Sequence, residues 1–186
     1  MTDTDTYILD CIRVWVWSGF YDAERVDEMI DDVLEDDADE DLLRAAVAPE
    51  FARKAAAEAQ WPATTDCDRL DQAFAALDAG GIIALQNAGY SMSDGLDEVS
   101  EVLAQRGRRG VVGYCFYHGQ DLERALDGQG LSIAFGALAD ETALKTAVGE
   151  RICALLRHHG FSVEWDGDPE RRIALPRFDW KRRFDG

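Results

Sequence analysis

Basic residues are scarce in this chain. Of its 186 residues, 19 are Lys or Arg and 37 are Asp or Glu, so the formal net charge at pH 7 is −18. A charge of this sign repels the phosphates of nucleic acids and the anionic headgroups of a membrane surface. We therefore expect no nucleic-acid partner and no membrane association. The same charge favours solubility and is complementary to a basic protein partner.

Long hydrophobic runs and paired cysteines are also missing. No apolar stretch approaches the ~20 residues that cross a bilayer. The acidic start, residues 1–5, has neither the basic nor the apolar part of a secretory signal. Four scattered cysteines (Cys11, Cys67, Cys115 and Cys153) form no C-x-x-C pair, which is typical of buried thiols in a reducing compartment. These absences predict a cytoplasmic protein without a disulfide framework.

Nucleotide-binding and metal-binding motifs do not occur. The sequence contains no G-x-x-x-x-G-K-[ST], no G-x-G-x-x-G and no G-x-S-x-G. Acidic series that start at Asp37 and Asp166 have the spacing of calcium loops but lack the glycine that such loops need at their sixth position. His158 and His159 are adjacent, whereas two histidines that chelate zinc from one helix face are four residues apart. We predict no metal and no cofactor.

The first 80 residues have the pattern of helices. Apolar residues are nearly continuous over 7–17, and they recur at helical spacing after Asp22, a candidate cap. Further helices are predicted over 41–60 and from Asp66 onward. Eight of the eleven residues in 31–41 are acidic. Within this stretch the run 35–41, six acidic residues and one alanine, is expected to be a solvated connector.

After residue 81 short apolar runs alternate with helical segments. The predicted strands span 82–87, 111–117, 131–137, 161–166 and 171–176, and the predicted helices span 93–106, 121–127 and 141–159. This order is the ferredoxin-like β-α-β-β-α-β pattern with one extra C-terminal strand. Its two crossovers place both helices on one face of an antiparallel sheet. We predict an α+β fold in which N-terminal helices (1–80) pack on this ferredoxin-like region (81–186) as one compact unit.

Two polar loops follow the first two predicted strands. Strands joined by a crossover run parallel, so both loops are expected at one end of the sheet, the usual place for a site. The candidate ligand-binding residues are Asn87, Tyr90, Asp94, His118, Gln120 and Asp121. His118 could act as an acid or base near neutral pH, with Asp94 or Asp121 orienting it. A structural interpretation stays open, because Ser93 could cap a helix and Asn87 suits a turn.

Two further patterns are interpreted as structural. Cys115 and His118 are three positions apart, so in a continuous strand they face opposite sides, and Cys115 is expected to be a buried thiol. The tail over 171–184 is basic with interleaved aromatic residues. We expect it to fold onto the chain's own acidic helices, with Trp180 and Phe184 buried.

The chain resembles a bacterial family described as a domain of unknown function in three segments: IALQNAGY at 83–90, GYCFYHGQDLE at 113–123 and GFSVEWDG at 160–167. The resemblance covers most of 66–185. It implies a bacterial cytoplasmic protein and supplies no catalytic residues. More distantly, the predicted topology and the acidity are similar to small ferredoxin-like regulatory proteins that bind and inhibit an enzyme.

Two hypotheses follow. In the first, the chain is a non-enzymatic interaction or regulatory module whose acidic helices bind a basic protein partner. In the second, it is a small-ligand-binding protein or an enzyme with a site at the sheet end near His118. The charge of the chain favours the first hypothesis, and the sequence leaves both enzymatic activity and oligomeric state open.

Overall fold

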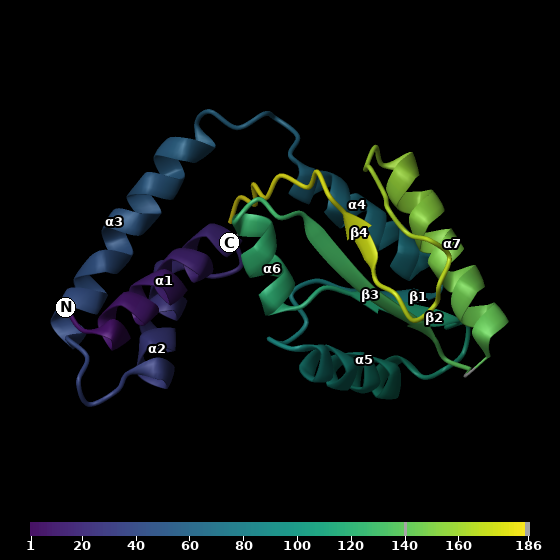
Figure 1. Ribbon diagram of the computed structural model, residues 1–186, viewed down its shortest axis with the longest axis horizontal. Helices are drawn as coiled ribbons and strands as arrows, with labels where there is room; N and C mark the ends of the chain where they lie inside the picture. Colours follow the sequence, from purple (N-terminus) through teal and green to yellow (C-terminus); the bar gives the residue numbers. More distant parts are fainter. Residues whose placement is uncertain (140, 185–186) are drawn as a thin grey trace. The chain divides into compact units, whose positions relative to one another are not determined.

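A computed structural model describes residues 1–139 and 141–184 (Figure 1). Within these residues the chain forms seven helices and a mixed four-stranded sheet, so the fold is α+β. The chain divides into two compact units. The first is Met1–Thr65 with the segment from Lys181 onward, and the second is Asp66–Trp180. The sheet unit therefore includes the last helix before residue 81, where the sequence pattern changes.

Three helices form the first unit: α1 (Asp3–Ser18), α2 (Ala23–Val33) and α3 (Glu40–Glu58). Their apolar faces share one core, built from Ile8, Ile12, Val16, Val26, Ile30, Leu43 and Val47. The predicted helices in this region are confirmed. The first begins earlier than predicted because Thr2 and Asp5 each accept a hydrogen bond from the other's backbone N–H.

The tail is held by its cationic side chains as well as its aromatic ones. The Arg182 guanidinium lies 4.7 Å from the centre of the Phe20 ring, and Arg183 lies 5.7 Å from that of Trp61. Such cation–π contacts stabilise an otherwise irregular segment. In the second unit Trp180 is buried, as predicted. The predicted burial of Phe184 is wrong, since this side chain is 41% exposed.

The second unit contains the sheet, whose strand order is β1-β2-β3-β4. The strands are β1 (Ile82–Leu85), β2 (Gly113–Phe116), β3 (Leu131–Ala137) and β4 (Ile173–Leu175). Strands β1 and β2 are parallel, and β3 is antiparallel to both β2 and β4. The carboxyl ends of β1 and β2 therefore lie at the same end of the sheet.

The ferredoxin-like order and the extra strand are not confirmed. A split β-α-β unit needs a strand between the two that its crossover joins, whereas β1 and β2 are hydrogen-bonded neighbours. The predicted strand over 161–166 is reduced to one bridge, between Glu164 and Ala174. Strand order depends on contacts between residues far apart in sequence, and hydrophobic periodicity does not report those contacts.

The helices cover both faces of the sheet. Helices α4 (Asp66–Ala79) and α7 (Thr142–His158) lie on one face, and α5 (Met92–Arg106) lies on the other (Figure 1). Gly95 of α5 packs on the Phe116 ring and Gly149 of α7 on the Phe135 ring, and these rings point to opposite faces. The prediction of both helices on one face is wrong because α7 joins two antiparallel strands, to which the crossover rule does not apply.

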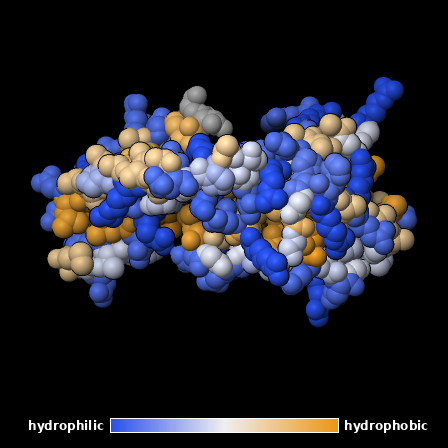
Figure 2. Space-filling model, turned by 90° about the horizontal axis from the view of Figure 1, so that it is seen from above, coloured by the Kyte–Doolittle hydropathy of each residue, from blue (hydrophilic) through white to orange (hydrophobic). Residues whose placement is uncertain are grey.

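Surface hydropathy is consistent with the composition. Figure 2 shows a face on which hydrophilic residues predominate and hydrophobic residues form smaller patches. Among the described residues, no helix combines the length and the apolarity needed to cross a bilayer.

Candidate functional site at the carboxyl ends of β1 and β2

The two polar loops lie against each other, as expected from the parallel strands. Three backbone hydrogen bonds join them: Ala88 N–H to Tyr117 O (2.9 Å), Gly119 N–H to Gly89 O (2.9 Å) and Gln120 N–H to Tyr90 O (3.2 Å). Asn87 begins the first loop with a φ of 50°, a left-handed conformation that asparagine tolerates better than most residues. The two loops are therefore joined through their backbones.

Asp94 has a structural role at the start of α5. Its carboxylate accepts hydrogen bonds from the backbone N–H groups of Tyr90 (3.1 Å) and Ser91 (2.8 Å) and from the Ser91 hydroxyl (2.9 Å). The bonds from Ser91 are the main cause that lowers the pKa of Asp94. The helix cap is Ser91, so the assignment of the cap to Ser93 is wrong. Asp94 is thus committed to capping its own helix.

His118 and Asp121 begin α6 (Gly119–Leu126), directly after β2. Both residues are buried, and Asp121 has no exposed surface. The Asp121 Oδ2 atom accepts the backbone N–H of His118 (3.2 Å) and lies 3.2 Å from Nδ1 of the His118 ring. The predicted pair therefore forms, inside the protein.

Two arginines complete what we call the Asp121 cluster, which consists of His118, Asp121, Arg124 and Arg172. Arg124 donates to Asp121 Oδ1 (3.1 Å) from the same helix. Arg172 reaches in from the start of β4 and donates to Asp121 and to the carbonyl oxygen of Ser132 (3.1 Å). Sequence reasoning missed both arginines. Arg172 lies 51 residues from its partner, so no local pattern connects them. Arg124 lies three residues after Asp121, and this i,i+3 spacing on a helix was a signal that could have found it.

Electrostatics keep His118 neutral. Burial lowers its pKa most, the nearby Arg172 and Arg124 lower it further, and the Asp121 carboxylate opposes them. Within the described residues two buried atoms of the cluster, His118 Nδ1 and Arg172 Nε, have no hydrogen-bond partner, since the close Nδ1–Asp121 approach lacks the direction of a hydrogen bond. A buried imidazole cannot exchange a proton with a substrate that it does not reach.

His118 is expected to make the protein less stable in acid. Its folded-state pKa lies below the usual value near 6.5, which the unfolded chain retains. Between these values the unfolded state binds the proton, so the free energy of unfolding falls as the pH decreases from about 7 toward 5. Urea unfolding across this range should show a smaller decrease in His118→Gln than in the wild type. Equal slopes in both proteins would contradict this assignment.

The remaining candidates, Tyr90 and Gln120, lie nearer the surface. The Tyr90 ring is exposed and packs beside Gly119, where an added Cβ would approach Cδ2 to 2.8 Å. The Tyr90 hydroxyl donates weakly to Glu123 (3.4 Å). Gln120 is half-buried and holds the loops together through its backbone. The structure thus brings all six candidates to one end of the sheet. Asp94 is engaged in a helix cap, Asp121 in ion pairs, and the His118 ring is buried.

One groove adjoins the cluster through a shared residue. It has a volume of 510 Å³, and its walls include Arg172, Arg171, Glu164 and Trp165. Within this groove Arg171 pairs with Asp166 (3.2 Å).

Other chemistry considered for this region finds no support. Cys115 is buried on the Phe135 side of the sheet, and burial raises the pKa of its thiol, so it is no activated nucleophile. In the described part of the chain no group of three or more His, Cys, Asp or Glu residues could hold a metal ion.

Comparison with known proteins identifies the family. The model of the family described as Domain of unknown function (DUF6891) matches residues 1–184. The match covers both units, and so extends beyond the 66–185 region in which the sequence motifs lie. No curated protein and no solved structure matches the chain.

Proposed function

The chain belongs to the DUF6891 family, and we propose that it is a non-enzymatic interaction module whose acidic segment binds a basic protein partner. The acidic segment is residues 22–41, which comprise the α2 region, the connector and the start of α3. It contains twelve Asp and Glu residues and one Arg. Every one of these carboxylate residues except Asp27 is exposed.

The backbone that carries these carboxylates is ordered. Val26 and Ile30 anchor α2 in the core of the first unit with no exposed surface. Asp22 caps α2 and Asp39 caps α3 through their side chains. The buried Asp5 carboxylate accepts the N–H of Asp39 (2.8 Å), which holds the connector in place. A pre-ordered charged surface loses less conformational entropy when it binds a partner.

Most of this charge is not compensated by the residues that the structure describes, and this observation carries the proposal. Arg44 contacts Asp27, Asp31 and Glu40. Arg25 pairs with Glu28 (2.7 Å). Eight exposed carboxylates of the segment have no ion-pair partner among residues 1–139 and 141–184, and the carboxylates of Glu24, Glu35, Asp36 and Asp41 have no hydrogen bond there either. An uncompensated, ordered negative surface attracts a basic surface, speeds association and selects against acidic partners.

The test compares two variants of equal charge. The segment variant carries Glu35→Gln, Asp36→Asn and Asp41→Asn. The control variant carries Asp97→Asn, Glu101→Gln and Glu150→Gln, which are exposed carboxylates of α5 and α7. Each immobilised protein is exposed to a lysate of the cells that express it, and retained proteins are purified and their affinity is remeasured.

We expect the wild type and the control to retain the same basic protein at low salt. The segment variant should bind it at least about tenfold more weakly, and high salt should release it from all three. Retention of no protein by the wild type at low salt would refute the proposal. Equal affinities of the two variants would refute the assignment to this segment.

The alternative, a small-ligand site or an enzyme near His118, has less support. It is favoured by the groove beside Arg172 and by two buried nitrogens, His118 Nδ1 and Arg172 Nε, that have no hydrogen-bond partner among the described residues. Against it, the His118 ring is enclosed and its neighbours Asp121 and Asp94 are engaged elsewhere. If a small ligand shifted the NMR signals of the His118 ring in a titration, that result would support this alternative.

A further inference from the structure

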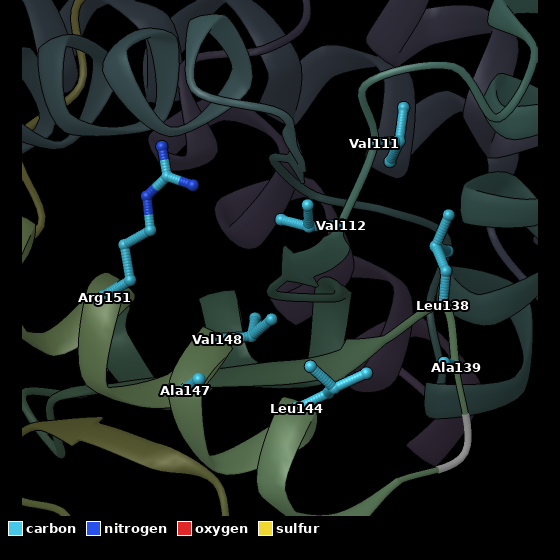
Figure 3. Close-up of a pocket in the computed structure, with 8 residues that line it drawn as sticks. All are labelled: Val111, Val112, Leu138, Ala139, Leu144, Ala147, Val148 and Arg151. Atoms are coloured by element: carbon cyan, nitrogen blue, oxygen red, sulfur yellow. The ribbon is translucent and has the colours of Figure 1, made fainter.

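An apolar cavity lies at the opposite end of the sheet from the Asp121 cluster. It has a volume of 430 Å³, within the range of small-molecule sites. Its walls come from the segments before β2 and after β3 and from one side of α7, and include Val111, Val112, Leu138, Leu144 and Val148. In Figure 3 the side chains of Val112, Leu144 and Val148 point into the same space.

The apolar walls remain open to solvent. Val112 is 50% exposed and Leu144 is 44% exposed, although the adjoining Val148 is buried. Apolar side chains that line a concave exposed surface lose contact with water when a hydrophobic group enters, which favours binding by about 25 cal/mol per Å² of buried area. The cavity therefore suits the hydrocarbon part of a ligand.

One positively charged side chain, Arg151, lies at the side of this cavity. Of the described residues that line it, Arg151 alone has a polar side chain. Figure 3 shows Arg151 extending from α7 along one side of the space, with the guanidinium group at its far end. Among residues 1–139 and 141–184 this group has no ion-pair partner, although the chain has an excess of carboxylates.

The guanidinium lies against Gly80. A Cβ at residue 80 would lie 2.2 Å from Nη2 of Arg151, so a larger residue there would displace the end of this flexible side chain. Arg108 and Arg109, in the segment that leads to the cavity wall, are exposed and also lack ion-pair partners in the described part of the chain. Three arginines without ion-pair partners in the described part of the chain, Arg108, Arg109 and Arg151, thus lie at or beside this cavity.

We propose that this cavity binds an amphipathic monocarboxylate, with its carboxylate on Arg151 and its hydrocarbon chain between Val112, Leu144 and Val148. A guanidinium binds a carboxylate through two parallel hydrogen bonds. A more polar ligand would find no further polar side chain among the described lining residues. The site lies in the second unit and does not depend on the acidic segment, so the two proposals can fail separately.

The test uses the full chain and titrates it calorimetrically with decanoate, below the concentration at which decanoate forms micelles, and with decanol. Wild type should bind decanoate more tightly than decanol. Arg151→Gln should weaken decanoate binding by about tenfold, equivalent to about 1.4 kcal/mol, and leave decanol binding unchanged. Gly80→Ala keeps the charge but displaces the guanidinium, and should weaken decanoate binding selectively as well.

Two variants serve as controls. Arg177→Gln removes an exposed arginine near the other end of the sheet and should leave decanoate binding unchanged. Val112→Asp places a carboxylate on the half-exposed wall, where folding tolerates it, and should abolish binding of decanoate. Absence of decanoate binding in the wild type would overturn the proposal. Equal weakening of decanoate binding by Arg151→Gln and Arg177→Gln would also overturn it. So would the finding that a second copy of the chain covers the cavity in solution.

Discussion

Replacing Asp121 by asparagine is expected to lower the free energy of unfolding by about 3–5 kcal/mol. The carboxylate is fully buried and accepts hydrogen bonds from Arg172 and Arg124 and from the His118 backbone. Arg172 is 29% exposed, so its guanidinium is only partly solvated. Without the carboxylate, the Arg172 guanidinium loses its ion-pair partner and the His118 backbone N–H loses its hydrogen-bond acceptor. Urea unfolding followed by circular dichroism measures the loss.

The arginines of the Asp121 cluster provide matched controls for this prediction. Arg124 is 51% exposed, so Arg124→Met should cost less than about 1 kcal/mol. Arg172→Met should cost more, because it leaves the Asp121 charge buried. The double variant Asp121→Leu with Arg172→Met should be more stable than either single change, since it removes both charges together. Additive losses in the double variant would show that the pair is not coupled.

Replacing Trp180 by alanine is expected to destabilise the second unit by about 3–5 kcal/mol. The indole ring is buried, with its centre 5.7 Å from that of the Tyr117 ring in an edge-on arrangement and 5.7 Å from that of Phe178. Tyr117 in turn has no exposed surface and donates to Gln86 from its hydroxyl (3.0 Å). Loss of the indole would leave a cavity beside the end of β2, and thermal unfolding would report it.

Phe184 supplies the comparison for Trp180. Both residues belong to the same aromatic tail, and both were predicted from the sequence to be buried. Because Phe184 is 41% exposed, Phe184→Ala should change the free energy of unfolding by only about 0.5–1 kcal/mol. If Trp180→Ala and Phe184→Ala lowered the free energy of unfolding by similar amounts, burial would not explain how the tail stabilises the protein.

Local patterns were sufficient for several features of the site. Helical spacing and caps such as Asp22 predicted the helices, and short apolar runs predicted four of the strands. The order strand–helix–strand also predicted that the loops with Asn87 and His118 lie together, because a crossover makes β1 and β2 parallel. Each of these predictions depends on residues close in sequence or on one general rule of chain connection.

The burial and pairing of the site residues could not be predicted in this way. His118 and Asp121 have the same sequence pattern whether they face solvent or the interior. The difference is made by Arg172, which precedes β4 and donates a hydrogen bond to the buried Asp121 carboxylate. Likewise, α5 is capped by Ser91 and not by Ser93, at the end of a loop that backbone hydrogen bonds join to the segment after β2.

The sequence by itself determined the α+β class, the acidic surface and the helical first unit, because composition and periodicity act through each residue's own preference for water or for a neighbouring turn. Only the tertiary structure decided the strand order, the opposite faces of α5 and α7, the enclosure of His118 and the apolar cavity beside Arg151. These features depend on the free energy of contacts between segments far apart in the sequence. A local pattern of residues does not show which distant segments come into contact.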